Sequence, residues 1–279
     1  MEPTTHIRPW KRLPAYLALA LLAGCFAVPF IWMVSSSLKD TRQIFADSPT
    51  LFPNPVEWGN YRDAVNFIPF MRYLGNTLVI CVGAIIGNVL SASLVAYSLG
   101  VLRWNGRDHL FKVLIASMLL PPQVTMVPVF VIFRSLGMID TYWPLILPSF
   151  FGAPFFIFLL RQFFLGIPQE LTEAARIDGC SEFGIYWRVV VPLSVPALAT
   201  VVLFSFIWTW TDFLTPLIYL QDQAKFTLSL GLQQFQESHS AQWGMLMAAA
   251  TLITLPIVAL FFAAQKTFVE GIVTTGLKG

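Results

Sequence analysis

Six long apolar segments constrain the fold of this 279-residue chain more than any other feature of its sequence. They lie at residues 13–38, 73–102, 110–133, 142–160, 192–220 and 244–264. Each provides the roughly 20 predominantly apolar residues that a helix needs to cross a bilayer. Charged residues make up 11% of the chain, against roughly 25% in a soluble domain. We therefore interpret the chain as an all-α membrane protein with six transmembrane helices.

The distribution of basic residues between the loops predicts the orientation of these helices. With the amino terminus inside, the cytoplasmic side carries eleven Lys and Arg residues: Arg8, Lys11, Arg12, Arg103, Arg107, Lys112, Arg161, Arg176, Arg188, Lys266 and Lys278. The outer side carries six: Lys39, Arg42, Arg62, Arg72, Arg134 and Lys225. Both chain ends and the connection between the fourth and fifth segments are therefore predicted to be cytoplasmic.

The predicted organisation is a single transmembrane domain, residues 13–268, between cytoplasmic tails at residues 1–12 and 269–279. Its long loops are the outer loops 39–72 and 221–243 and the cytoplasmic loop 166–191. Turn-forming residues fill the first outer loop, in which a surface helix is expected over residues 58–67. In the second segment, Gly83 and Gly87 form a G-x-x-x-G pattern, which predicts close packing inside a helix bundle.

The cytoplasmic loop contains the most informative polar stretch, Glu173 to Pro192, with the sequence EAARIDGCSEFGIYWRVVVP. Good helix formers occupy residues 169–178, and Gly179 follows, where a helix commonly ends in a left-handed residue. Ser181 suits the cap of a second short helix, and Pro192 suits the first turn of the next membrane helix. We predict two short helices hinged at Gly179. An ordinary loop with some helix is the alternative.

The same stretch resembles the EAA loop of bacterial binding-protein-dependent ABC importers, whose pattern is E-A-A, three residues, G, nine residues, I-x-L-P. The chain has Glu173-Ala174-Ala175, Gly179, Val189, Val191 and Pro192 at this spacing, with Val in place of Ile and Leu. In that family the loop forms a coupling helix that docks into a cleft on a separate ATPase subunit. The resemblance implies the type I ABC importer permease fold with a cytoplasmic coupling helix.

The family's coupling role, carried over to this loop, gives each residue an expected task. Glu173 is expected to be the charged contact to the ATPase, Gly179 the hinge, and Ala174 and Ala175 the small residues that permit close docking. The remaining residues of the predicted coupling set are Arg176, Asp178 and Pro192. Alternatively, the charge of Glu173 only balances Arg176 one helical turn away.

Further matches point to the sugar-importer, maltose-transporter-like branch of that family. These are DSPTLFPNPVEWGNY in the first outer loop, LGMIDT at 136–141, WTDFLTPL at 210–217 and the FVEGIVTTGLKG tail. Thr211 stands where the branch usually has Asn, which leaves any role of that amide in doubt. The outer loop 221–243 matches one that reaches into the solute-binding protein in maltose-type importers. A plain solvated loop is the alternative.

The resemblance also implies the partners and the location of the chain. We expect a second homologous permease, two ABC ATPase subunits and an extracellular solute-binding protein, assembled in a bacterial inner membrane. The chain has no G-x-x-x-x-G-K-S/T phosphate loop. No cofactor is therefore expected in the chain itself, because ATP and Mg²⁺ would be bound by the ATPase subunits. No metal site is expected either, since Cys25, Cys81 and Cys180 are not clustered with histidines.

Five residues are candidates for the wall of a translocation pathway. Gln123 follows two prolines that kink the third segment, and Asn76 opens the second. Trp208 and Trp210 offer flat faces on which a sugar ring can stack, with an interfacial aromatic belt as the alternative. Asp212 is an acidic residue within a membrane segment and so is a functional candidate by default. Its alternative role is that of a structural hydrogen-bond acceptor.

The leading functional hypothesis is therefore the non-catalytic permease subunit of a carbohydrate ABC importer. A permease for a glycerol 3-phosphate-like polyol phosphate is an alternative, but an anionic substrate would favour basic residues in the pathway. Lys112 is the only Lys or Arg in the six segments, and it is the third residue of the third segment, at its predicted cytoplasmic end. An ion-coupled secondary transporter would require several intramembrane charges and inverted repeats. A membrane enzyme would require a catalytic constellation, and neither requirement is met by the sequence.

Overall fold

The computed structural model describes residues 13–48, 50–237 and 242–276, and every element that these residues form is a helix. Contacts divide the chain into two compact units. One contains the chain up to Ile68 together with Leu232–Thr254, and the other contains Pro69–Gly231 together with the chain from Leu255 onwards. Helices α14 (Leu228–Glu237) and α15 (Trp243–Gly276) each continue from one unit into the other.

The first unit contains α1 (Leu13–Ser37), α2 (Thr41–Ile44) and α3 (Gly59–Phe67), and α3 confirms the predicted surface helix within one residue. Hydrogen bonds hold the start of α3 against the end of α1. The Asn60 side-chain amide donates to the carbonyl oxygens of Ser37 at 3.0 Å and Lys39 at 2.9 Å. Lys39 is buried, lies 4.5 Å from the centre of the Trp32 ring and donates to the carbonyl oxygen of Thr50. Burial lowers the pKa of its ammonium group.

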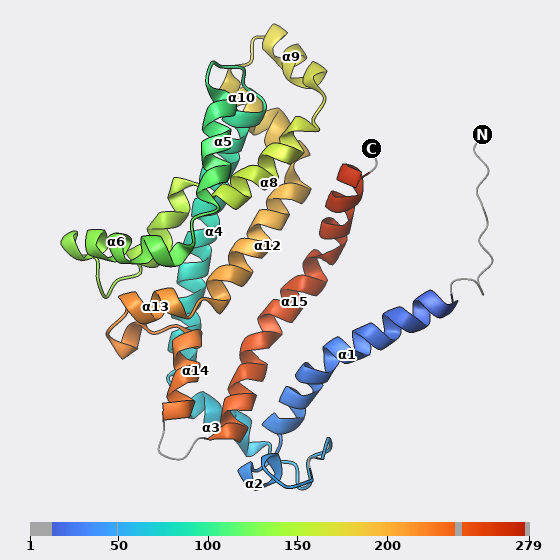
Figure 1. Cartoon of the computed structure of the whole chain (residues 1–279), viewed down its shortest axis with the longest axis vertical. Coiled ribbons are helices and arrows are strands. Elements are labelled where there is room, and N and C mark those ends of the chain that lie inside the picture. The colour runs from blue at the N-terminus through green and yellow to red at the C-terminus, as the bar shows by residue number, and fades with distance from the viewer. Residues whose placement is uncertain (1–12, 49, 238–241, 277–279) are drawn as a thin grey trace. The chain divides into compact units, whose positions relative to one another are not determined.

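The second unit is built around α4 (Phe70–Gly100), which packs against α8 (Pro154–Leu165) and α12 (Val195–Thr211) (Figure 1). Between them in the chain lie α5 (Arg107–Ser117), α6 (Pro122–Ser135), α7 (Trp143–Ile146) and the 3₁₀ helix η2 (Leu147–Phe151). The connection from α8 to α12 forms α9 (Gln169–Ile177), α10 (Glu182–Ile185), the π-helical η3 (Tyr186–Val190) and α11 (Val191–Leu193). Beyond α12 lie α13 (Leu214–Tyr219) and η4 (Gln223–Lys225).

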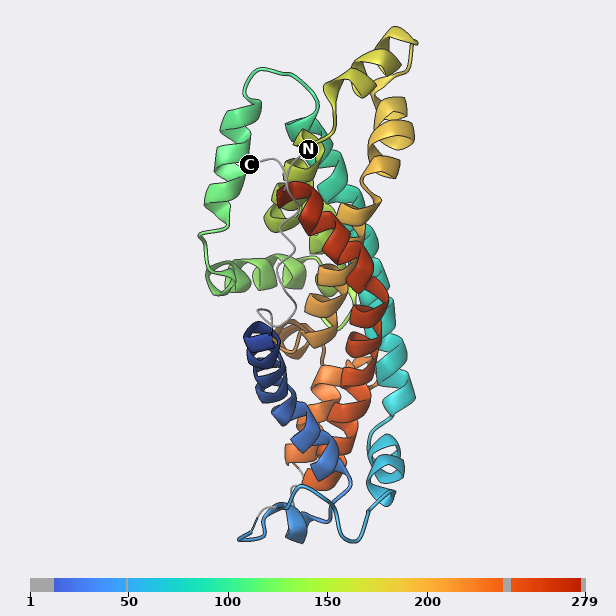
Figure 2. The same cartoon turned by 90° about the vertical axis from the view of Figure 1, so that its right-hand side faces the viewer.

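The helices account for the six predicted membrane segments, but two of these segments are broken. Among the residues that the structure describes, four helical stretches are long and apolar enough to span a membrane: Leu13–Ser37, Phe70–Gly100, Trp143–Leu165 and Trp243–Gln265. The third predicted segment is bent by 97° between α5 and α6 (Figure 2). Pro121 and Pro122 lie at this break, where proline removes backbone donors and clashes with the preceding turn. The sequence predicted a kink there, and the observed bend is sharper.

The fifth predicted segment differs from its prediction at both ends. It is bent by 79° where α11 meets α12, so Pro192 lies in α11 and the long helix begins at Val195. At the other end α12 stops at Thr211, and Leu214–Tyr219 forms the separate helix α13. Residues 192–220 are long and predominantly apolar, which suggested one continuous span, although Asp212 lies directly at the second break.

Close contact with α7 and η2 explains the small residues of α4. A Cβ added at Gly83 would lie 2.8 Å from a side-chain carbon of Ile146. One added at Gly87 would lie 2.8 Å from the Phe150 ring and 2.9 Å from the Cβ of Ser149. The predicted role of the G-x-x-x-G pattern in bundle packing is thus confirmed.

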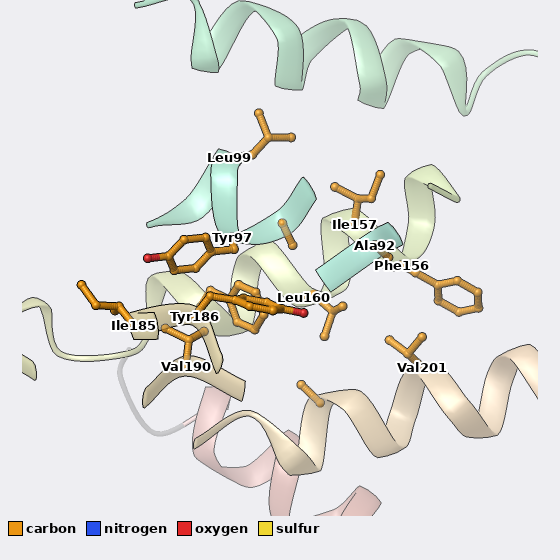
Figure 3. Close-up of a cluster of buried hydrophobic side chains, with 13 residues drawn as sticks. Ala92, Tyr97, Leu99, Phe156, Ile157, Leu160, Ile185, Tyr186, Val190 and Val201 are labelled. Atoms are coloured by element: carbon orange, nitrogen blue, oxygen red, sulfur yellow. The ribbon is translucent and has the colours of Figure 1, made fainter. Parts of the chain in front are cut away.

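The core of the second unit joins α4, α8 and α12 to the α10–η3 segment (Figure 3). It comprises thirteen buried side chains: Ala92, Ala96, Tyr97, Leu99, Phe156, Ile157, Leu160, Phe164, Ile185, Tyr186, Val190, Ala197 and Val201. One buried hydrogen bond, from Asn88 Nδ2 to Ser205 Oγ at 2.8 Å, also links α4 to α12. The segment that follows Gly179 is therefore packed directly against the membrane helices.

Candidate functional site

The turn after α9 is formed by a glycine in the left-handed conformation. Gly179 has φ of +79°. Its N–H donates to the carbonyl oxygen of Arg176 at 3.0 Å, and the N–H of Cys180 donates to that of Ala175 at 3.0 Å. These two bonds form a Schellman motif, which satisfies carbonyl groups at the helix end. The prediction of a helix that ends at Gly179 is confirmed.

A capped second helix follows this turn. The hydroxyl of Ser181 accepts a hydrogen bond from the backbone N–H of Gly184 at 3.2 Å and so caps α10, as predicted. Ile185 and Tyr186 then enter the core, and the Tyr186 hydroxyl lies 2.7 Å from Ser93 Oγ on α4. We call α9, the turn and α10 the coupling loop (residues 169–185), after the role that the sequence resemblance implies for it.

An ion pair closes the coupling loop on itself. Arg176 donates from Nε to Glu182 Oε1 at 2.7 Å and from a terminal nitrogen to Oε2 at 3.3 Å. The Tyr97 hydroxyl on α4 donates to the same Oε2 at 2.7 Å. The hydrogen bond from Arg176 lowers the pKa of Glu182, with a further contribution from Tyr97. Arg176 is thus paired with Glu182. The hydrogen bond to Glu182 raises the pKa of the Arg176 guanidinium, and the nearby charge of Glu173 raises it further, so the alternative role of Glu173 as a balance to Arg176 is compatible with the structure.

The two faces of α9 have different surroundings. Gln169, Thr172, Glu173 and Arg176 recur at helical spacing and line a cavity of about 440 Å³, whose other walls include Gly100 to Trp104 and Phe164. Ala175 is half-buried against the core.

Most of the remaining positions of the coupling loop are exposed, among them Ala174, Asp178 and Gly179, whereas Cys180 and Gly184 are half-buried and Ile185 is buried. Apolar side chains are exposed there too: Ile177 by 86%, Phe183 by 68% and Leu171 by 45%. Of the two alanines expected to permit docking, only Ala174 lies at the exposed surface.

The five candidate pathway residues do not meet at one place. Asn76 donates to the carbonyl oxygens of Ala224 at 3.0 Å and Phe226 at 2.9 Å, so its amide holds the loop after α13. Gln123 is exposed in the first turn of α6. None of the five lines the cavity beside α9 or the one beside η4 described below.

The two tryptophans and Asp212 lie at the end of α12. Trp208 is 48% exposed and stacks on Phe156, with ring centres 5.0 Å apart. Trp210 is only 2% exposed, so its face is covered by the chain itself. Asp212 Oδ1 accepts the N–H of Thr215 at 3.1 Å, in the manner of a helix cap for α13. Of the two tryptophans, only Trp208 has an exposed ring.

Two charged residues with structural roles were missed by sequence reasoning. Asp140 adopts φ of +59°, and its Oδ1 accepts the N–H groups of Gln221 and Asp222, each at 3.0 Å. Lys225 donates to its Oδ2 at 2.5 Å and to its carbonyl oxygen at 2.8 Å. Both charges line a cavity of about 520 Å³ beside Trp143. Asp140 lies in the LGMIDT match, which was the available signal.

The hydrogen bonds and the ion pair of Asp140 lead to a prediction about the stability of the fold in acid. The backbone bond from Asp222, with Lys225 and Gln221, lowers the pKa of Asp140 from 3.8 to about 2. A depressed pKa stabilises the fold above the unfolded-state value, and this contribution is lost as the pH falls from about 4 to 2. We expect Asp140→Asn to lower the free energy of unfolding by about 1–2 kcal/mol at pH 7. Thermal unfolding at several pH values measures this.

The matched control for this prediction is Asp47→Asn, which changes an exposed carboxylate. The difference in the free energy of unfolding between wild type and Asp140→Asn should shrink below pH 4, because protonation of Asp140 removes the same negative charge that the substitution removes. If this difference in stability stays constant down to pH 2.5, or if Asp47→Asn has an equal effect, then the interactions of Asp140 with the loop after α13 do not stabilise the fold.

Comparison with known proteins gives concordant results. Residues 92–273 match the family described as binding-protein-dependent transport system inner membrane component. The chain is 36% identical over 267 residues to the probable ABC transporter permease protein YurM of Bacillus subtilis, covering 95% of this chain and 87% of that protein. It is 30% identical over 283 residues to the arabinooligosaccharides transport system permease protein AraQ of Halalkalibacterium halodurans, covering 99% of both.

Two further likenesses extend over nearly the whole chain. The diacetylchitobiose uptake system permease protein DasC of Streptomyces coelicolor is 30% identical over 280 residues, covering 100% of both chains. A crystal structure of a bacterial ABC transporter involved in the import of the acidic polysaccharide alginate contains a chain that superimposes with a TM-score of 0.81 at 23% identity. That match covers 96% of this chain and 99% of the other, and it shows the shared fold.

Proposed function

The chain belongs to the family of inner membrane components of binding-protein-dependent transport systems, and we propose that it is the permease subunit of an ABC importer for a sugar or oligosaccharide. The observation that carries this proposal is the coupling loop. It exposes Leu171, Ile177 and Phe183 at the end of a capped helix pair that is packed into the core. Large apolar side chains exposed on a loop that is anchored in the core are typical of a protein–protein contact.

The substrate class is inferred from the relatives and from the chain's own charge. AraQ and DasC are named for arabinooligosaccharide and diacetylchitobiose uptake. The six predicted segments contain no Lys or Arg except Lys112, near the predicted cytoplasmic end of the third, as suits a neutral substrate better than a phosphorylated polyol. Trp208, with its partly exposed indole, is the residue best placed to stack against a sugar ring.

The proposed assembly contains a second permease, two ABC ATPase subunits and an extracellular binding protein. The chain itself is non-catalytic in this proposal, and ATP and Mg²⁺ bind to the ATPase subunits. Its coupling loop and both termini lie in the cytoplasm. ATPase closure displaces the docked loop, and the packing of Ile185 and Tyr186 against α4 and α8 passes this displacement to the membrane helices as a rigid-body change.

Docking through these exposed apolar side chains can be tested by co-purification of the ATPase subunits. Ile177→Lys places a charge in the proposed contact, and we expect it to reduce the recovered ATPase at least about tenfold, as for a residue central to an interface. Lysine suits the last turn of a helix, so α9 itself is retained. The amount of ATPase per permease, measured after purification in detergent, gives the result.

The matched control is Phe52→Lys. Phe52 is also an exposed apolar residue, at 81%, but it lies in the outer loop of the first unit. Equal recovery of the ATPase with Ile177→Lys and with wild type would contradict the proposed docking surface, and so would equal losses from both substitutions.

A further inference from the structure

Two side-chain links join the coupling loop to the end of α4. At the start of α9, Arg103 donates to the side-chain oxygen of Gln169 at 2.7 Å. At its end, Arg176 and the Tyr97 hydroxyl converge on Glu182. Apart from these links α9 contacts mainly α10, and the cavity of about 440 Å³ separates much of its inner face from the membrane helices.

The three side chains that meet at Glu182 differ in how far they are exposed. The side chains of Arg176 and Glu182 are 37% and 46% exposed, and an ion pair with this exposure contributes little by itself. Tyr97 differs, because it is 5% exposed, lies in the core and contacts the Tyr186 ring edge-on at 5.4 Å. Its hydroxyl is therefore the fixed point of the three-residue network, and the two exposed side chains are held to it.

We propose that Tyr97 is a positioning residue for the coupling loop, which fixes the angle between α9 and α10 through Glu182 and Arg176. Glu182 is the first residue of α10 and Arg176 lies in the last turn of α9, so the network spans the Gly179 turn. A displacement of α9 is then passed to α4 through a hydrogen bond to a charged acceptor as well as through apolar packing. This role rests on the proposed function.

The experiment uses the complete assembly of permeases, ATPases and binding protein in nanodiscs. The readout is the ratio of ATPase activity with substrate-loaded binding protein to basal activity. Tyr97→Phe removes one hydroxyl, and we expect it to lower this ratio about fivefold to tenfold with little change in basal activity. The control is Tyr186→Phe, which keeps the aromatic ring that packs in the core and removes only a hydroxyl that lies 2.7 Å from Ser93 Oγ on α4. Its ratio is expected to stay near the wild-type value.

A second comparison tests whether Tyr97 acts through Glu182. Glu182→Gln should lower the ratio by a similar factor, and the double variant should be no worse than the more severe single variant, because both changes break one network. Additive losses, or equal effects of Tyr97→Phe and Tyr186→Phe, would overturn the positioning role. An assembly of wild-type subunits that the binding protein does not stimulate would instead overturn the proposed function and, with it, the role of Tyr97.

Discussion

Gly179→Pro is expected to abolish stimulation of the ATPase by the binding protein while the membrane helices remain folded. Proline fixes φ near −65° and has no N–H, whereas Gly179 has φ of +79° and donates to the carbonyl oxygen of Arg176. The Schellman turn is lost and the angle between α9 and α10 changes. We expect a local cost of about 3 kcal/mol or more, enough to reduce coupled activity more than a hundredfold.

Gly179→Asn is the matched variant for this prediction. A Cβ at position 179 would meet nothing within 4 Å, so the effect of a substitution there depends on backbone conformation and not on packing. Asparagine tolerates the left-handed region and keeps the N–H, so Gly179→Asn should retain most of the stimulation. Comparable activity of the proline variant and the asparagine variant would show that the turn is not needed.

Gly87→Leu is expected to have the largest effect on folding. Its Cβ alone would lie 2.9 Å from the Cβ of Ser149, which is fixed to the backbone of η2 and cannot swing aside. Overpacking of this kind costs about 1–3 kcal/mol and occasionally more, and leucine adds three further carbons. We expect the folded protein to be nearly absent, as measured by the monodisperse fraction in detergent and by thermal unfolding.

Gly75→Leu provides the control within the same helix. A Cβ at Gly75 would meet nothing within 4 Å, so leucine there removes the conformational cost of glycine in a helix without creating a clash. Its yield should equal or exceed that of wild type. Similar losses from both substitutions would mean that position 87 is not a close contact between α4 and η2.

Local chemistry explains what could be predicted from the sequence. Apolar length predicted the membrane helices, since each must satisfy its own backbone. Gly179 and Ser181 predicted the turn and the cap, because a left-handed glycine and a capping hydroxyl act on their immediate neighbours. Gly83 also predicted a close contact, because a residue without a side chain lets another element approach the helix backbone. It did not show which element makes that contact.

Distance along the chain explains what could not be predicted. Tyr97 and Glu182 are 85 residues apart, and nothing in either local sequence indicates that they meet. The segment around α12 is apolar on all sides, so periodicity could not show that Trp210 is covered while Trp208 is partly exposed. Asp140 lies among turn formers, where an acidic residue is a common local hydrogen-bond acceptor, but its partners Gln221, Asp222 and Lys225 are more than 80 residues away.

The central claim, that the coupling loop contacts the ATPase, is tested most directly by a photo-crosslinking amino acid at position 177. Ile177 is 86% exposed at the end of α9, and irradiation of the assembled transporter should join this chain to the ATPase subunit. The same probe at Phe52, which is 81% exposed, should give no such product. An ATPase crosslink from position 177 alone is the predicted result. No ATPase crosslink from position 177, or equal yields from both positions, would contradict the proposed coupling.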